Sequence, residues 1–175
     1  MLGAPRLLSA IGDILVPIAE LRDFLRVDGA DLDTEIASFL AASAGEIERR
    51  TGFRLGRQTI EVVGDTWADF AHLLVGPVRA IAEVQYQDRA GDWHPLKSTD
   101  VELFGGELEQ GVRAAAGRTL PRLRSAAAVV KMRLDVGSEA IETPLRWALL
   151  VMCRAKMDGV EADVDHLLYS FTINP

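Results

Sequence analysis

The sequence predicts an α+β fold, with helices packed on a small antiparallel β-sheet and a C-terminal tail. Residues 17–51 carry apolar side chains at helical spacing, and from Phe53 onward the pattern changes to short alternating runs rich in β-branched residues. A chain of 175 residues with 49% hydrophobic content suits one domain with a substantial core. We therefore expect an N-terminal arm at 1–16, a domain at 17–157 and a tail at 158–175.

Two helices open the predicted domain, on either side of the acidic connector Asp28-Gly29-Ala30-Asp31. The first helix ends at Val27, and the residues on its apolar face are Ile18, Leu21, Phe24 and Leu25. The second helix is long, and the residues of its apolar stripe are Ile36, Phe39, Leu40, Ala44 and Ile47. We expect Asp31 or Asp33 to cap the long helix and Gly52 to end it in the left-handed conformation.

The long helix also carries a run of small residues, Ala41-Ala42-Ser43-Ala44-Gly45. Small side chains let the backbone of another helix approach closely, since the distance between packed helices depends on the side chains at the contact. The run therefore either packs inside the domain or contributes to a contact with a neighbouring subunit.

The middle of the chain predicts strands. Alternating or β-branched runs occupy residues 59–63, 72–75, 82–86 and 128–136. The turn Arg89-Ala90-Gly91 closes a hairpin onto Trp93. After Ser98 the chain has a loop-rich tract, longer than most connections, whose glycines are Gly105, Gly106, Gly111 and Gly117. Connections of this length are usually functional or disordered.

The last long helix is predicted to begin with Thr143 as its cap and Pro144 in its first turn. Its core stripe consists of Leu145, Ala148, Leu149 and Met152. A second stripe lies about a third of a turn away and consists of Trp147, Leu150 and Val151. Either the sheet and the long helix cover this second stripe, or it meets a neighbouring subunit.

The tail carries a third apolar pattern, with Val160, Val164, Leu167, Leu168 and Phe171 at helical spacing. A helix of about a dozen residues is marginal alone in water, so this face needs a partner surface. The partner is either this domain's own core or another protein. We favour docking on another protein, because the acidic break Asp158-Gly159-Val160-Glu161 separates the stripe from the preceding helix.

Four arginines, Arg113, Arg118, Arg122 and Arg124, lie within twelve residues that contain no acid. They are either solvated residues of a loop and strand entrance, or contacts to an acidic partner surface or to DNA passing nearby. The formal charge of the whole chain is −7, which disfavours general attraction to nucleic-acid phosphate. The aromatic residues typical of single-strand binding are also missing from this tract.

Catalytic and metal-binding patterns are absent from the sequence. The acidic residues Asp28, Asp31, Asp33 and Glu35 lack calcium-loop spacing, and the histidines His72, His94 and His166 lie in separate elements. Cys153 lies within an apolar helical stretch, where a buried inert thiol is expected. We therefore predict no enzymatic activity, no cofactor and no metal. No targeting segment or run of bilayer-spanning length is found, which predicts no membrane association.

The order of motifs along the chain resembles the head-tail connector (adaptor) family of tailed phages and phage-derived gene transfer agents. The stretch from Leu21 to Leu55 carries the first part of this resemblance. The later motifs, in order, are Gly76-Pro77-Val78, Val84-Gln85-Tyr86-Gln87-Asp88 with Gly91, Leu120-Pro121, the strand from Val129 to Gly137, Thr143-Pro144-Leu145 and Leu167-Leu168-Tyr169.

The resemblance implies a structural protein that forms a homo-oligomeric ring under the portal protein, extends its DNA channel and joins the capsid to the tail. Its partners would be the portal and a tail-completion (stopper) protein, with double-stranded DNA only passing through. It would be cytoplasmic during assembly and then part of the virion. The residues implied in docking on the portal or a neighbour are Val164, Leu167, Leu168, Tyr169 and Phe171. The alternatives are a DNA-packaging accessory factor and a soluble enzyme.

Overall fold

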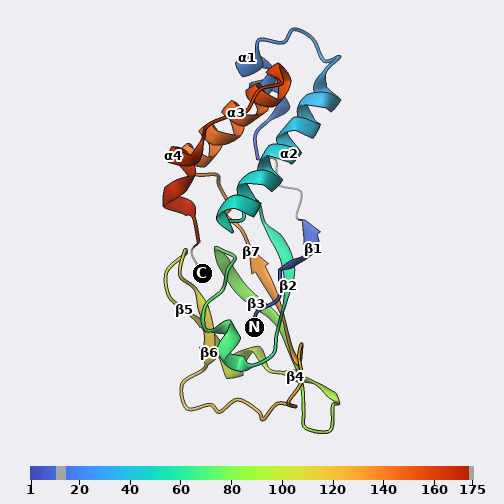
Figure 1. Cartoon of the computed structure of the whole chain (residues 1–175), viewed down its shortest axis with the longest axis vertical. Helices are drawn as coiled ribbons and strands as arrows, with labels where there is room; N and C mark the ends of the chain where they lie inside the picture. Colours follow the sequence, from blue (N-terminus) through green and yellow to red (C-terminus); the bar gives the residue numbers. More distant parts are fainter. Residues whose placement is uncertain (11–14, 174–175) are drawn as a thin grey trace.

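The computed structural model describes residues 1–10 and 15–173 of the chain. The molecule is elongated, with its helices gathered at one end and its strands at the other (Figure 1). The predicted α+β class is therefore confirmed, and so is the antiparallel sheet. No helix in the described part of the chain is both long and apolar enough to cross a membrane.

The helical end consists of α1 (Ile18–Leu25), α2 (Asp33–Thr51), α3 (Thr143–Asp158) and the short α4 (Asp165–Leu168). As predicted, α2 ends at Gly52, which has a left-handed φ of 73°. A Cβ on this glycine would also lie 2.8 Å from the backbone oxygen of Leu74. Gly52 therefore serves both the backbone turn and the close approach of a loop.

The predicted helix caps need correction by one residue each. Leu32 is the N-cap of α2 and makes no side-chain capping bond, while Asp33 is the first helical residue and pairs with Arg22 at 3.3 Å. Glu142 likewise precedes α3, so Thr143 lies inside the helix and does not cap it. Asp33 still lies where the helix dipole favours a carboxylate, although it accepts no capping bond.

The main sheet has five antiparallel strands in the order β1-β2-β7-β3-β4. These strands are β1 (Arg6–Ala10), β2 (Gln58–Gly64), β7 (Val130–Val136), β3 (Val78–Gln87) and β4 (Trp93–Leu96). The central strand β7 alternates buried and accessible residues, and its Met132 pairs with Val62 on one side and Val84 on the other. One face of the sheet is therefore a core face, as the sequence alternation predicts.

Two predictions for the middle of the chain were wrong. Residues 72–75 form no strand; they follow the 3-10 helix η1 (Trp67–Ala71), and their alternation reflects burial of Leu73 and Val75 in a loop. The glycine-rich tract contains a hairpin of β5 (Val101–Phe104) and β6 (Gly111–Ala114), which the short 3-10 helix η2 (Ser98–Asp100) precedes.

Two separate clusters of buried side chains stabilise the molecule, one at each end. The helical core draws on α1, α2, α3 and the C-terminal segment, and its fully buried large residues include Leu21, Ile36, Ile47, Leu145 and Leu149. The β core lies under the main sheet, and its fully buried large residues include Ile60, Phe70, Leu73, Met132 and Leu134. Each end therefore has its own apolar interior.

A polar junction joins the two ends. The carboxylate of Glu48 on α2 accepts hydrogen bonds from the Arg54 guanidinium at 2.9 Å, the Leu55 backbone N–H at 3.0 Å and the Gln58 amide at 2.7 Å. The side chain of Gln110 links two parts of the β end itself, since it accepts a hydrogen bond from the N–H of Val78 and donates one to the Val78 carbonyl oxygen. The bonds of Glu48 fix where β2 leaves the helical end.

Candidate interaction surfaces

The C-terminal segment packs on the helical core of its own domain. Val164 is 0% exposed and Leu168 is 3% exposed, while Leu167 and Phe171 are half-buried against the same core. The backbone N–H of Ile173 donates to the carbonyl oxygen of Thr51 at 2.7 Å. These contacts correct the expectation that the apolar stripe of the tail faces another protein.

The predicted dozen-residue tail helix is also wrong. The helical turn α4 spans only Asp165–Leu168 and continues as the 3-10 helix η3 (Tyr169–Phe171). A segment this short gains its stability from the surface that it covers. Two of its residues stay outside the core, since Tyr169 is 84% exposed and Val160 is also exposed.

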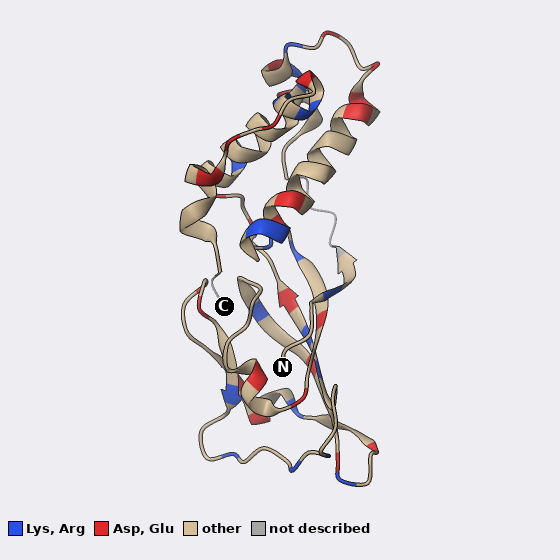
Figure 2. Ribbon diagram, in the orientation of Figure 1, with Lys and Arg blue, Asp and Glu red and all other residues tan. Residues whose placement is uncertain are grey.

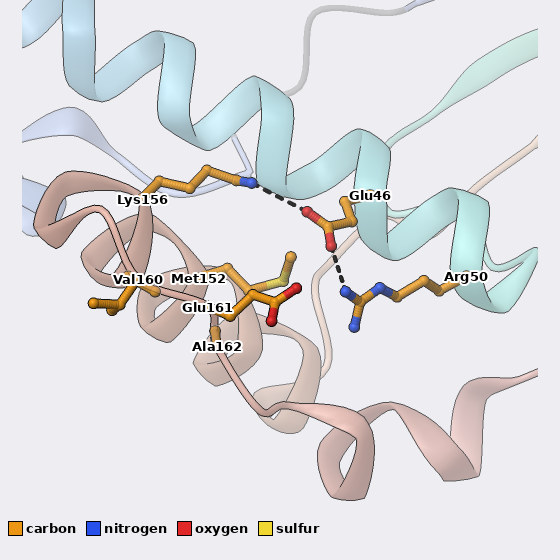
Figure 3. Close-up of a pocket in the computed structure, with 8 residues that line it drawn as sticks. Glu46, Arg50, Met152, Lys156, Val160, Glu161 and Ala162 are labelled. Atoms are coloured by element: carbon orange, nitrogen blue, oxygen red, sulfur yellow. Dashed lines mark hydrogen bonds and ion pairs between the residues drawn. The ribbon is translucent and has the colours of Figure 1, made fainter.

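A small pocket of about 60 Å³ lies between α2, α3 and the start of the C-terminal segment (Figure 3). At its edge the Glu46 carboxylate lies between two cations, accepting a hydrogen bond from the Lys156 ammonium at 3.1 Å and pairing with the Arg50 guanidinium at 2.5 Å. Arg50 also reaches Asp165 of α4 at 3.2 Å. The hydrogen bond from Lys156 holds the pKa of Glu46 below its ordinary value. This arrangement clamps the tail and the two long helices together.

The second stripe of α3 is only partly available on the surface. Leu150 is 7% exposed and belongs to the helical core, so its proposed place in a subunit interface is corrected. Trp147 is 49% exposed and meets Phe24 of α1 edge to face, with ring centroids 5.6 Å apart. Val151 is half-buried beside the same core. Trp147 and Val151 therefore remain the candidates from this stripe.

The small-residue run of α2 is divided between the interior and the surface. Ser43 and Ala44 are buried, and the Ser43 hydroxyl lies 3.8 Å from the Cys153 thiol of α3. Ala41 and Gly45 lie on the exposed side of α2. Cys153 is buried as predicted, and burial raises the pKa of its thiol. Close approach of α2 and α3 inside the domain therefore explains part of the run.

The four arginines of the acid-free tract fall into two pairs. Arg113 binds Glu102 at 2.7 Å and lies over the Phe104 ring, and Arg118 pairs with Asp100 at 3.4 Å. Arg113 is thereby paired within the β5–β6 hairpin, and Arg118 is paired with the 3-10 helix η2 that precedes it. Arg122 and Arg124 are exposed and form no ion pair with any residue in 1–10 or 15–173.

Among the residues that the structure describes, no group of three or more His, Cys, Asp or Glu side chains is placed to hold a metal ion. His94 at the β end pairs with Asp88 at 3.0 Å, whereas His166 lies in α4 at the other end. The pocket beside Glu46 is smaller than the several hundred Å³ that sites for small organic ligands usually occupy, although larger hollows of about 290 to 520 Å³ lie elsewhere on the described surface.

No protein-family model matches the chain, and no curated protein matches it. The chain is similar to a chain in the neck of an empty gene transfer agent particle with C6 symmetry, with a TM-score of 0.80, 20% identity and coverage of 99% of this chain and 97% of the other. A chain in the virion of a native gene transfer agent particle gives a TM-score of 0.78 at 23% identity, covering 98% and 96%.

A chain in the neck of a native particle with C12 symmetry gives a TM-score of 0.77 at 20% identity, covering 99% and 97%. At these identities the similarity shows a shared fold. It extends over nearly the whole length of both chains, so it includes the helical end and the β end together. This chain therefore has the fold of a chain from the neck of gene transfer agent particles.

Proposed function

We propose that the protein is a head-tail connector subunit of a phage-like particle, where it forms a ring under the portal, extends the DNA channel and joins the capsid to the tail. The single observation that carries this proposal is the shared fold with chains of gene transfer agent necks over 97% of those chains. The order of connector-family motifs along the sequence supports it independently. We propose a structural role with no catalysed reaction.

The shape and charge of the chain suit this role. A closed ring needs a heterologous interface, in which one face of each subunit meets a different face of the next. An elongated subunit with helices at one end and strands at the other offers two separated ends for two different partners, the portal and a tail-completion protein (Figure 1). The formal charge of −7 suits a channel that DNA passes without adhering.

Exposure at the surface selects the residues that we propose for contacts with other subunits. Trp147 of α3 is a large, half-exposed aromatic side chain whose ring meets Phe24 of α1. Exposed aromatic side chains are typical interface anchors. We propose Trp147 and Val151 for the subunit interface, and Tyr169 for contact with the portal or a neighbouring copy.

Mixing the purified chain with its cognate portal tests the proposal. We expect weak self-association of the chain alone and ring formation on the portal, visible by light scattering and electron microscopy. The variant Trp147→Ala should fold but form fewer rings, whereas Arg49→Ala, an exposed substitution on α2, should assemble normally. A chain that stays monomeric and binds no portal by either method would refute the connector proposal.

A further inference from the structure

Charge is distributed unequally between the two ends of the molecule. Residues 15–56 and 138–173, which build the helical end, contain 14 acidic and 8 basic residues, a formal charge of −6. Residues 1–10 and 57–137, which build the β end, contain 11 of each and are neutral. Figure 2 shows only basic residues along the loop from β6 to β7, at the end opposite the helices. The β end is therefore neutral overall and less acidic than the helical end, and the charged residues of this loop are all basic.

The loop at residues 115–129 concentrates this cationic character. No acidic residue occurs between Glu109 and Asp135, and this interval contains five arginines and one lysine. The loop has no regular secondary structure, yet it is fastened along its length. Four hydrogen bonds hold it. The backbone N–H groups of Ala115 and Arg124 donate to the carbonyl oxygens of Asp100 and Gln87. The Trp67 indole N–H donates to the Pro121 carbonyl oxygen, and the N–H of Ala128 donates to the Asp65 carboxylate.

Apolar contacts fasten the same loop, because Leu120 and Leu123 pack against the β core. Arg122 and Arg124 lie on either side of Leu123 and are exposed. Their backbone positions are thus fixed by these contacts, while both residues remain exposed. A loop that is already ordered loses little conformational entropy when it binds, so these arginines are presented ready for a partner.

The surroundings of the two arginines decide between partners. The Arg124 guanidinium lies beside Gly91 of the β3–β4 turn, where a Cβ would come within 2.9 Å of its Nη1. The same turn carries the carboxylates of Asp88 and Asp92 and one cation, Arg89. Asp88 accepts hydrogen bonds from the N–H groups of Ala90, Gly91 and Asp92 and pairs with His94, so its negative charge is held in place.

Duplex DNA is a stiff polyanion, so a duplex that lies on the arginines would also bring phosphates against these fixed carboxylates, and like charges repel. A peptide or protein segment can instead place a carboxylate against each arginine, in the planar two-bond geometry that a guanidinium favours, and turn its other charges away from the aspartates. We propose that Arg122 and Arg124 form a docking site for an acidic protein surface at the β end. This inference rests on the proposed function in one respect: the acidic protein is taken to be another component of the particle.

Binding of two anionic probes to the full-length chain tests this site. The probes are a fluorescent oligoglutamate peptide and a short DNA duplex, measured by fluorescence anisotropy at low and at physiological salt. We expect oligoglutamate to bind more tightly than DNA and to weaken as salt rises, since exposed charges are screened. The double variant Arg122→Gln/Arg124→Gln should lose about tenfold or more in affinity for oligoglutamate.

The matched control is Arg26→Gln/Arg49→Gln, which removes the same charge from two exposed arginines of the helical end. It should bind oligoglutamate as the unaltered chain does, and thermal melting should show that both double variants fold. Equal losses in the two variants, or no binding of oligoglutamate at all, would overturn the site. Tighter binding of DNA through the same arginines would overturn the acidic-protein assignment. Ring formation by the unaltered chain is scored separately, so its failure would count against the connector role alone.

Discussion

The helical end and the β end of this molecule are stabilised in different ways. The β core is built from one continuous part of the chain, between β2 and β7, and backbone ladders fix the register of its strands. The helical core is built from both parts that flank it, and the C-terminal segment closes it by side-chain burial. The β end therefore depends on backbone ladders, which join strands as distant in sequence as β2 and β7, whereas the helical end depends on burial of side chains from both flanking parts of the chain.

Deleting residues 160–175 should give the largest effect and should fall on the helical end. The deletion removes Val164, Leu168 and Ile173, all buried, and burial of each such side chain contributes roughly 1.5 to 3 kcal/mol. We expect a fall in the melting temperature large enough to see directly by circular dichroism. Hydrogen exchange should show loss of protection first in α2 and α3.

The control for this deletion is Tyr169→Ala, which alters the same segment at an exposed position. It should change the free energy of unfolding by less than about 0.5 kcal/mol, the range of surface substitutions. If the truncated chain melts as the full chain does, the burial of the C-terminal segment described here is incorrect.

Single core substitutions should sharpen the comparison. Leu149→Ala in α3 and Leu134→Ala in β7 each remove a fully buried leucine, and each should cost about 2 to 5 kcal/mol. Leu40→Ala should cost less, because Leu40 is only half-buried beside the helical core. Denaturant titrations of the three variants test this order. A Leu40→Ala cost equal to that of Leu149→Ala would contradict the observed face of α2.

Much of this architecture could be predicted because local patterns follow burial. The stripe with Ile36 and Ile47 predicted α2, and alternation predicted β2, β3 and β7 to within a few residues. Gly52 predicted the end of α2 because its left-handed backbone is a local property. Periodicity also indicated that the apolar residues of the tail need a partner surface.

The partner surfaces themselves could not be predicted from periodicity. Val164 and Leu168 show the same spacing whether they pack on α3 or on another protein, so the stripe alone left both readings open. Residues 72–75 alternate like a strand, although the ladder is absent and burial alone produces the pattern. The junction of Glu48 with Gln58 carries no sequence signal, since it depends on how the chain turns after Gly52.

Substitution at the junction tests whether the two ends depend on each other. Glu48→Ala removes the acceptor of three hydrogen bonds and leaves the part-buried Arg54 guanidinium without its carboxylate. We expect a cost of about 1 to 3 kcal/mol, with a broader thermal transition as the two ends melt less cooperatively. Arg49→Ala, the neighbouring exposed position on α2, should leave both quantities unchanged. Equal melting curves for the two variants would show that Glu48 does not couple the ends.

The smallest effect should appear on acidification, and it should differ between the ends. The hydrogen bond from Lys156, with the charges of Lys156 and Arg50, holds the pKa of Glu46 below its ordinary value of 4.5. A carboxylate with a lowered pKa in the folded state contributes stability above its ordinary pKa and loses it as the pH falls through the folded value. The α2–α3 clamp should therefore weaken below about pH 4.5. Melting the chain and the Glu46→Gln variant between about pH 3 and 6 measures this loss, which should be absent in the variant.

At the β end the same titration should have only a local effect. The N–H of Asp92, followed by His94, lowers the pKa of Asp88, but this exposed carboxylate holds only the β3–β4 turn. Asp88→Asn should therefore change hydrogen exchange in the turn at low pH and leave the melting temperature almost unaltered. A fall in melting temperature on acidification that persists in Glu46→Gln and disappears in Asp88→Asn would place the acid-sensitive contact at the β end. That outcome would reverse the assignment, because the clamp of the helical end would then contribute little to stability.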